Sequence, residues 1–450
     1  MPKQKVAYVC QQCGNESTKW QGQCPDCHEW NSLVEFAPRK SKIEPTKGYS
    51  GGKSEVKTLK DVSLEDVSRF STGMSEFDRV LGGGIVPGSV ILLGGDPGIG
   101  KSSILLQVMT KLSQQYNALY VTGEESLEQV ALRALRMGLP ADQLKMMIET
   151  DVESIVEVAG KEKPMIMVID SIQTMQLAEV QSAAGGVSQV RESAAYLTHF
   201  AKRNNCAIFL VGHVTKSGEV AGPRVLEHIV DAVIFIEGQN DGRYRVMRSL
   251  KNRFGAVNEL GIFAMTEAGM KEVKNPSAIF LNRSEQEIAG STIVSMWEGS
   301  RPLLAEVQAL VDENHFGQPR RVCVGVDGNR IAMLLAVLHR HAKVNVGDQD
   351  VFINVVGGVK IIETSADLSI VLAISSSLRN RIIPKDWIIF GEVGLSGEIR
   401  PVPYGQERIQ EAQKHGFTKA IIPFSNKPKR AVKGIEVVAV KTLLEAVEYI

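Results

Sequence analysis

Residues 95–102 read Gly95-Asp96-Pro97-Gly98-Ile99-Gly100-Lys101-Ser102 and fit the spacing GxxxxGK[ST]. An apolar, strand-like run precedes them at 90–93, and a helix-like run begins at Ser103. Glycines let the backbone curl so that its N–H groups face phosphates, and the start of a helix adds a favourable dipole. We therefore expect the run from Gly95 to Ser103 to bind the phosphates of ATP, with Lys101 at the β and γ phosphates and the Ser102 hydroxyl on Mg²⁺.

Further strand-like runs follow this loop, at 118–122, 165–169, 207–211 and 232–236, with helix-like segments between them. This alternation predicts an α/β fold with a doubly wound parallel sheet. In such sheets, ligands bind at the carboxyl ends of the strands. Glu124, Asp170 and His213 each stand at the end of a strand-like run, so we expect them at the same sheet edge as the phosphate loop.

The residue types at these strand ends suggest separate roles. Asp170 follows an apolar strand and is predicted to hold Mg²⁺ through its water shell. Glu124 is predicted to polarise the attacking water as a general base, with Glu125 as the alternative. His213 is predicted to sense the γ-phosphate, and a strand-end histidine without a catalytic role is the alternative.

Four of the six cysteines, Cys10, Cys13, Cys24 and Cys27, form two CxxC pairs near the N-terminus. Two such pairs supply the four thiolates of a tetrahedral Zn²⁺ site, which is closed and therefore structural. Two disulfides or a redox pair are the alternatives. So short a segment buries little apolar surface, so the metal is expected to supply much of its folding energy.

Length and composition place the chain among multidomain globular proteins. It has 450 residues, 44% of them hydrophobic, and a formal net charge of zero, so binding to nucleic acid must rely on local patches. No run resembles a signal peptide or a membrane span, which predicts a cytoplasmic protein without a membrane partner. The pattern predicts a zinc module at 1–36, a flexible linker at 37–60, an ATPase domain at 61–273 and a second α/β domain at 274–450.

The segments Thr72-Gly73 and 81–84, the phosphate loop and the pentapeptide Lys251-Asn252-Arg253-Phe254-Gly255 together resemble the RecA-type ATPases. With the four-cysteine N-terminus, the whole chain is similar to the RadA (Sms) family of bacterial DNA-repair proteins. The resemblance implies a RecA-like core in a homo-oligomeric ring, a hexamer by expectation. It further implies a DNA-dependent ATPase that moves on single-stranded and branched DNA, promotes branch migration, and works with a recombinase of the RecA type.

Lys251 and Arg253 flank Asn252 at a strand end, so both side chains can point the same way. The phosphate loop already has Lys101, and two further cations have no obvious use there. The resemblance implies that they act across a subunit boundary on the neighbour's γ-phosphate. A surface charge pair is the alternative.

Two segments, 176–191 and 216–224, lack an apolar period and resemble the DNA-binding loops of RecA-type proteins. Their Gln and Ser side chains and backbone amides suit contact with phosphates regardless of base sequence. Ordinary flexible crossovers are the alternative.

The C-terminal runs 391–402 and 416–423 are similar to the proteolytic domain of Lon, which uses a Ser–Lys dyad. Ser365 stands at the serine position, but no lysine occurs near 405–407, where the base is expected. A serine without a base is a poor nucleophile, so this domain is predicted to be non-proteolytic. An ATP-dependent Lon-like protease, or a signalling ATPase of the clock type with a RecA-like core, remain alternatives for the whole chain.

Overall fold

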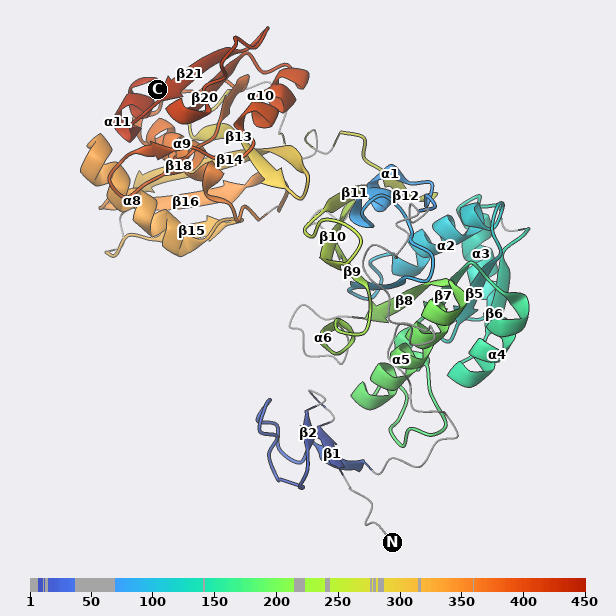
Figure 1. Ribbon diagram of the computed structural model, residues 1–450. Coiled ribbons are helices and arrows are strands. Elements are labelled where there is room, and N and C mark those ends of the chain that lie inside the picture. Colours follow the sequence, from blue (N-terminus) through green and yellow to red (C-terminus); the bar gives the residue numbers. More distant parts are fainter. Residues whose placement is uncertain are drawn as a thin grey trace, which may run out of the picture. The chain divides into compact units, whose positions relative to one another are not determined.

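The computed structural model describes residues 7–10, 12, 15–36, 69–140, 142–213, 223–238, 243–275, 277, 281, 287–314, 317–358 and 360–450. The predicted linker at 37–60 lies outside these residues, as do Cys13 and most of the second predicted DNA loop. The chain divides into two compact units, Met1–Val273 and Lys274–Ile450, and each is described by itself (Figure 1).

A small antiparallel sheet forms the N-terminal module. Its strands are β1 (Ala7–Cys10), β2 (Glu16–Ser17) and β3 (Leu33–Phe36), in the order β2-β1-β3. The core of the module consists of Cys10, Cys24 and Leu33, with Tyr8 packed against them. So few apolar side chains cannot hold a fold by burial alone, which fits the expected contribution of a metal.

The region predicted to be an ATPase domain is built on one large sheet, which has nine strands within the described residues, in the order β12-β11-β10-β9-β4-β8-β7-β5-β6. The parallel strands are β4 (Val90–Gly95), β5 (Ala118–Thr122), β6 (Lys145–Ile148), β7 (Ile166–Asp170), β8 (Ala207–His213) and β9 (Ala232–Gly238). An antiparallel extension continues with β10 (Tyr244–Asn252), β11 (Leu260–Thr266) and β12 (Gly269–Glu272).

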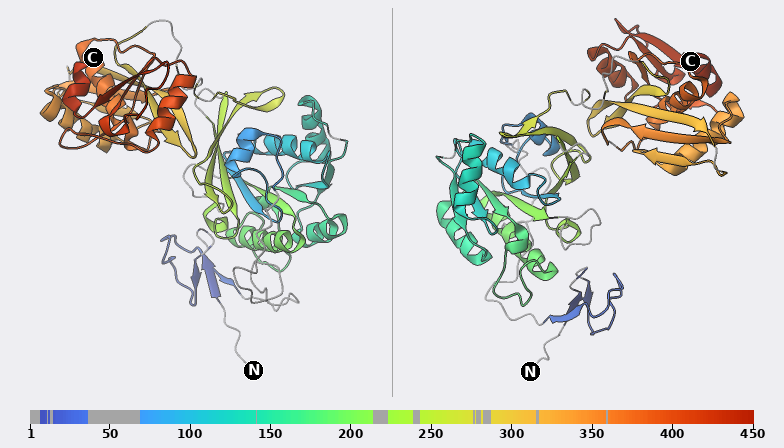
Figure 2. Two further views of the ribbon diagram at one scale, coloured as in Figure 1. Left: turned by 45° about the horizontal axis from the view of Figure 1, so that its top comes forward. Right: turned by 180° about the vertical axis from the view of Figure 1, so that it is seen from behind.

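Helices cover both faces of this sheet (Figure 2). They are α1 (Ser75–Val80), α2 (Lys101–Leu112), α3 (Leu127–Arg136), α4 (Val152–Glu162), α5 (Val187–Asn204) and the short α6 (Pro223–Leu226). Alternate side chains of β4 enter different cores: Ile91 and Leu93 pack with α1, α2 and α3, whereas Val90 and Leu92 pack with α4 and α5. Because both faces are buried, a central strand can be apolar throughout.

Side-chain caps set where several helices begin. Ser126 and Gln129 form a capping box at α3, with the Ser126 N–H donating to Gln129 Oε1 at 2.9 Å. Asp151 accepts from the Ser154 N–H at 2.9 Å at the start of α4. Each cap binds N–H groups that the first turn of a helix leaves without a partner, so these polar residues define the helix starts.

The C-terminal unit contains a second mixed sheet, in the order β15-β16-β14-β13-β17-β20-β21. Its strands are β13 (Ser291–Glu298), β14 (Arg301–Glu313), β15 (Arg321–Val324), β16 (Gln349–Val355), β17 (Trp387–Ile389), β20 (Lys419–Pro423) and β21 (Glu436–Val440), beside a small ribbon of β18 (Glu392–Val393) and β19 (Ile399–Arg400). The helices are α8 (Gly328–Ala342), α9 (Asp367–Arg379), α10 (Gly405–Lys414) and α11 (Leu443–Glu448).

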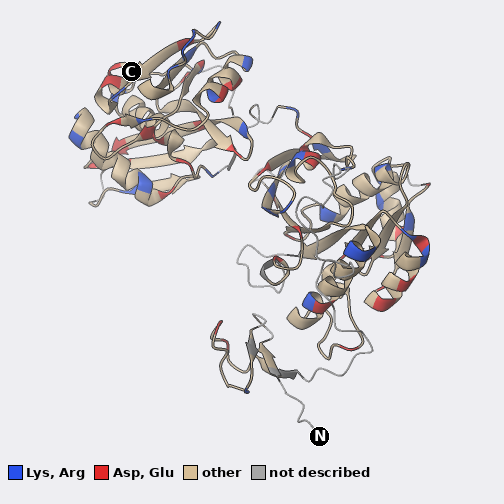
Figure 3. Ribbon diagram, viewed as in Figure 1, with Lys and Arg blue, Asp and Glu red and all other residues tan. Residues whose placement is uncertain are grey.

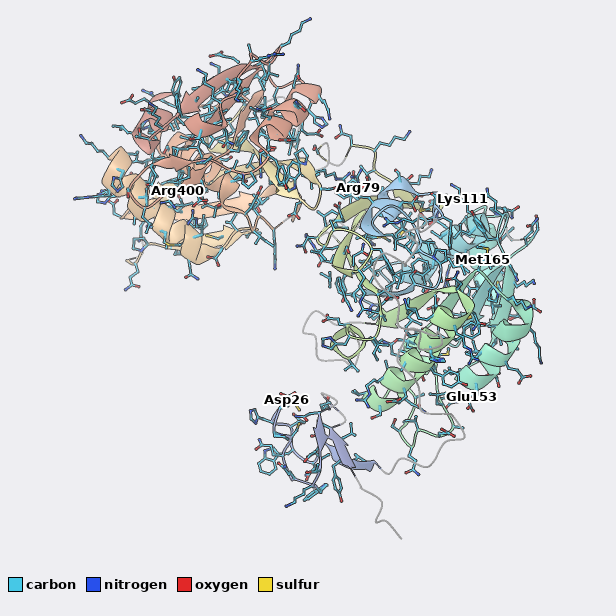
Figure 4. All side chains as sticks on the ribbon, viewed as in Figure 1. Asp26, Arg79, Lys111, Glu153, Met165 and Arg400 are labelled. Carbon is cyan, nitrogen blue, oxygen red and sulfur yellow. The ribbon has the colours of Figure 1, made fainter. Side chains whose placement is uncertain are left out.

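Charged side chains of both signs are interspersed along the ribbon of both units (Figure 3), in keeping with the zero net charge. Arg400 (Figure 4), for example, lies between two carboxylates, 2.6 Å from Glu398 and 3.7 Å from Glu392. Within the described residues, no helix combines the length and the apolar character needed to cross a membrane.

Candidate functional site

The phosphate loop connects β4 to α2. Gly95 has φ 151°, and a Cβ there would lie 2.7 Å from the Ile236 carbonyl oxygen on the neighbouring strand, so only glycine fits. Gly100, with φ 109°, turns the chain into α2, which starts at Lys101. The N–H groups at this helix start suit an anion such as a phosphate.

Lys101 is buried, with 4% of its surface exposed, and its ammonium binds the loop itself. Its Nζ donates to the carbonyl oxygens of Gly95 and Asp96 at 2.8 and 2.9 Å. Burial lowers the pKa of Lys101, and the charges of Asp170 and Glu124 act in the opposite direction. The Lys101 ammonium therefore lies against the phosphate loop, close enough to Asp170 and Glu124 for their charges to act on it.

Asp170 ends β7, and its carboxylate accepts hydrogen bonds from two hydroxyls. Tyr120 on β5 donates to Oδ2 at 2.5 Å, and the Ser102 hydroxyl is also hydrogen-bonded to this carboxylate. Burial raises the pKa of Asp170, and both hydrogen bonds oppose that shift. The two residues expected to hold Mg²⁺, Ser102 and Asp170, are thus in direct contact, and an oxygen pair of this kind suits that ion.

The two candidate bases have different partners. Glu124 accepts a hydrogen bond from the Ser171 hydroxyl, and its charge acts on both Lys101 and Asp170. Glu125 forms an ion pair with Arg133 on α3, and its backbone N–H donates to Thr122 Oγ1 at 3.0 Å. Glu124 is thus the carboxylate more closely linked to the phosphate loop. The backbone of His213 pairs with Gly95 across β8 and β4, so this residue stands at the same sheet edge.

Lys251 and Arg253 lie at the opposite edge of the sheet. The Lys251 ammonium donates to the carbonyl oxygens of Glu227 and Val230, and Arg253 Nη1 lies 3.4 Å from Asp231 Oδ1. The Asp231 N–H in turn donates to the carbonyl of Val90, the first residue of β4. The six residues of β4 separate this edge from the phosphate loop by about 20 Å, because a strand rises ~3.3 Å per residue. Neither side chain can reach the phosphate loop of the same chain.

Sequence reasoning missed three side chains that hold the site. Tyr120 supports Asp170; Arg245 on β10 donates to the Ile99 carbonyl at 3.1 Å; and Gln107 on α2 binds the backbone of Met270 on β12. A tyrosine in the otherwise apolar strand before Glu124 was a usable signal. Arg245 and Gln107 gave none, because their partners are backbone atoms far away in the sequence, in the phosphate loop and in β12.

The first predicted DNA loop is shorter than the sequence suggested. Its last part, from Val187 to Arg191, belongs to α5 and is not a loop. Gln189, proposed for phosphate contact, is buried, and its side-chain amide binds the N–H and carbonyl of Leu177, both at 3.2 Å. The start of this helix was missed because the sequence gives no signal for it. The helix α5 begins at Val187 without a side-chain cap, directly after Gly185-Gly186, and two successive glycines are typical of a loop.

Three of the four predicted metal ligands lie together. The Sγ atoms of Cys10, Cys24 and Cys27 are within 4.8 Å of one another, and those of Cys10 and Cys27 are 3.6 Å apart. In a tetrahedral site with Zn–S distances of ~2.3 Å, sulfur atoms lie about 3.8 Å apart. The described thiols therefore fit one Zn²⁺, and the fourth predicted ligand, Cys13, lies outside the described residues.

Removing this metal should unfold the N-terminal module while leaving the ATPase region folded. We expect one Zn²⁺ per chain, because four thiolates complete a closed site. Metal analysis of the purified protein, and proteolysis before and after chelation, measure this. A protein without zinc, or one in which the four thiols are oxidised, would contradict the assignment.

In the C-terminal unit, Ser365 lies beside an arginine where a proteolytic dyad needs a lysine. Arg408 on α10 is fully buried; its Nη1 donates to Ser365 Oγ at 3.2 Å, and the guanidinium pairs with Glu363 at 2.8 Å. The Ser365 hydroxyl itself donates to Glu363 Oε1 at 2.5 Å. A guanidinium stays protonated, so Arg408 cannot take the proton of the serine.

Comparisons with known proteins match all three parts of the chain. Residues 8–35 match the rubredoxin metal binding domain, residues 55–219 an AAA domain, and residues 329–426 the subunit ChlI of Mg-chelatase. The predicted fold class is confirmed: a metal-binding module precedes a RecA-like ATPase core and a C-terminal α/β domain. Among solved structures, a KaiC-like protein of Pyrococcus horikoshii OT3 matches 46% of this chain and 99% of its own, at 19% identity and a TM-score of 0.40.

Curated relatives match over nearly the full length. The DNA repair protein RadA of Haemophilus influenzae is 59% identical over 98% of this chain and 97% of its own. The protein of that name from Escherichia coli is 58% identical over the same shares, and that of Bacillus subtilis is 46% identical over 99% of this chain and 98% of its own. Identity of this extent shows that the chain, a P-loop ATPase, belongs to the RadA family of DNA repair proteins.

Proposed function

We propose that the protein is a DNA-dependent ATPase that works as a ring on single-stranded and branched DNA and promotes branch migration during recombination. One observation carries the proposal. The sheet bears Lys101, Ser102, Glu124 and Asp170 at one edge, and Lys251 and Arg253 at the other. Because the two cations cannot serve their own subunit's phosphate loop, they suit a site completed by a neighbour. A head-to-tail contact of this kind repeats from one copy to the next, and it gives a ring when the rotation between neighbours closes.

The residues at the phosphate loop divide the work of hydrolysis. Backbone N–H groups from Gly95 to Ser103 hold the phosphates, and Lys101 leaves its loop carbonyls to bind the β and γ phosphates. Glu124 orients and polarises the attacking water, since its charge already acts on this group of residues. Lys251 and Arg253 of the adjacent subunit stabilise the charge that develops on the transferred phosphoryl group. His213, whose backbone pairs with that of Gly95, would sense the presence of the γ-phosphate.

Ser102 and Asp170 would hold Mg²⁺, which neutralises phosphate charge when bound. Tyr120 keeps the Asp170 carboxylate turned toward Ser102. Zinc stays in the N-terminal module as a structural ion held by Cys10, Cys13, Cys24 and Cys27.

DNA binding rests on the relatives' role in DNA repair and on the loop after β7. Within the described residues, the segment from Gln176 to Gly186 follows that strand, and it is the part of the predicted loop that remains outside α5. We place the domain boundaries at 36/37, 60/61 and 273/274, with six copies per ring and a RecA-type recombinase as partner.

Branch migration on a synthetic three-strand junction tests this proposal. Wild-type protein with ATP is expected to extend the heteroduplex, and a nonhydrolysable ATP analogue is expected to stop it. Size analysis of the nucleotide-bound protein should show a ring. A monomeric protein that leaves the junction unchanged would refute the motor.

Ser365→Ala should leave ATP hydrolysis and branch migration unchanged. The lysine of the dyad is missing, because the side chain that reaches Ser365 from α10 is Arg408, and the carboxylate that accepts from the hydroxyl, Glu363, is already paired with that arginine. Peptide and casein cleavage by the wild-type protein measure the alternative protease function. Cleavage that disappears in the Ser365→Ala variant would restore the Lon-like protease.

A further inference from the structure

Asp231 is a buried acid that lies just before β9, at the sheet edge that carries Lys251 and Arg253. Only 2% of its surface is exposed. Its Oδ2 accepts from the Val90 N–H at 3.0 Å and from the ammonium of Lys202 on α5. Its own N–H donates to the Val90 carbonyl at 2.9 Å, so backbone and side chain both bind the first residue of β4. The Asp231 carboxylate is therefore fixed to the start of β4, which lies in the middle of the strand order.

The other oxygen of this carboxylate faces Arg253. Arg253 Nη1 lies 3.4 Å from Asp231 Oδ1, and the Arg253 N–H donates to the Asp231 carbonyl at 3.1 Å. The arginine side chain is otherwise exposed, at 56%, and its guanidinium has no further partner among the described residues. The guanidinium is thus held at one nitrogen, Nη1, while its other N–H groups stay available for an anion.

Lys251 binds the same turn. Its Nζ donates to the carbonyl of Val230, directly before Asp231, at 2.8 Å and to that of Glu227. Phe254, next to Arg253, lies under the Lys202 ammonium, with 6.0 Å from Nζ to the ring centre. The segment from Lys251 to Phe254 therefore contacts Asp231, or its partners, at several points.

A buried carboxylate is costly unless it is paired, and Lys202 together with the Val90 N–H already satisfies one oxygen. The exposed pair with Arg253 contributes little stability, because a half-exposed ion pair is screened by solvent. The ion pair instead affects geometry, because it limits the directions in which the Arg253 guanidinium can extend. Catalysis depends on such limits, since a misplacement of ~1 Å can cost about 100-fold in rate.

We propose that Asp231 is the positioning residue for Arg253: it aims the guanidinium at the phosphate loop of the adjacent subunit. This inference rests on the proposed function, in which Arg253 acts in trans. Loss of the carboxylate should lower kcat and leave nucleotide affinity unchanged, because Lys101, Ser102 and Asp170 lie at the other sheet edge.

The test variant is Asp231→Asn, whose amide oxygen can still accept from Val90 while the ion pairs are lost. Asp231→Glu keeps the charge but displaces it by one methylene, so it tests the position of the carboxylate separately from its charge. Asp350→Asn is the matched control, because Asp350 is equally buried and pairs with an exposed arginine, Arg320, at 2.5 Å in the other unit. We expect kcat to fall about 10- to 100-fold in both Asp231 variants and to stay at the wild-type value in Asp350→Asn.

Two further measurements separate positioning from a general defect. The double variant Asp231→Asn/Arg253→Ala should be no slower than Arg253→Ala, since both changes remove the same feature, a correctly oriented Arg253 guanidinium. Asp231→Asn subunits mixed with Lys101→Ala subunits should regain activity. Where an Asp231→Asn subunit supplies the phosphate loop and a Lys101→Ala subunit supplies Arg253, both parts of the interface are intact. Titration of the Asp231 variants with a fluorescent nucleotide should give the same Kd as for the wild-type protein.

Wild-type kcat in both Asp231 variants, additive losses in the double variant, or mixed rings without rescue would each overturn the inference. Arg253→Ala, measured in the same series, keeps the two claims apart. If Arg253→Ala hydrolyses ATP normally, the trans site of the proposed function is wrong. If Arg253→Ala is inactive but rescued, and the Asp231 variants are normal, the positioning role alone is wrong.

Discussion

Lys101→Ala is expected to abolish ATP hydrolysis. The ammonium is the buried cation of the phosphate loop, bound to the carbonyls of Gly95 and Asp96 beside Asp170. Removing one preorganised charged donor typically costs on the order of 10²–10³ in rate, and here it also removes a binding contact to the phosphates. Steady-state phosphate release, with and without single-stranded DNA, measures the loss.

Lys111→Ala provides the matched control for this prediction. Lys111 (Figure 4) stands on the same helix, α2, but its Nζ donates to the Gly73 carbonyl at 2.8 Å, away from the loop. Hydrolysis should stay near the wild-type rate in this variant. Turnover at the wild-type rate in Lys101→Ala would remove the site assignment altogether.

Arg253→Ala should still bind nucleotide, because Lys101, Ser102 and Asp170 remain at the other edge of the sheet. Hydrolysis should nevertheless fall by about 10³-fold or more, the usual contribution of an arginine finger in phosphoryl transfer. Arg136→Ala, which changes an exposed arginine in the last turn of α3, is the control and should behave as wild type. Nucleotide titration and phosphate release on the same preparations separate binding from chemistry.

Mixing distinguishes a trans role from a cis role. Arg253→Ala subunits combined with Lys101→Ala subunits form some interfaces with an intact phosphate loop and an intact arginine, so part of the activity should return. A cis role predicts no rescue at any ratio, because every subunit then has a broken site. Inactive rings that demonstrably contain both variants would rule out action across the boundary.

The sequence predicted the features that depend on residues close together in the chain. The turn from β4 into α2 follows from nearby glycines and a lysine, so Gly95 to Ser102 could be placed at once. The ends of β5 and β7 were also readable, because apolar runs there stop at acidic residues. Their proximity followed from the rule that parallel strands end at one edge, and Thr122 does pair with Asp170.

Contacts that depend on tertiary structure were not readable. The start of α5 at Val187 was taken for loop, and Gln189 for a surface residue, because its partners at Leu177 become neighbours only in the fold. The missing lysine of the C-terminal unit was predicted, but its replacement by Arg408 was not. The Tyr120–Asp170 and Asp231–Arg253 contacts join residues 50 and 22 positions apart, which no local pattern encodes.

ATP hydrolysis measured with and without single-stranded DNA tests the central claim most directly, with Lys101→Ala as the background and casein cleavage as a control. The account predicts slow hydrolysis by the wild-type protein alone, strong stimulation by single-stranded DNA, no signal from Lys101→Ala, and intact casein. Hydrolysis that is indifferent to DNA over all concentrations, or casein cleavage coupled to ATP, would contradict it.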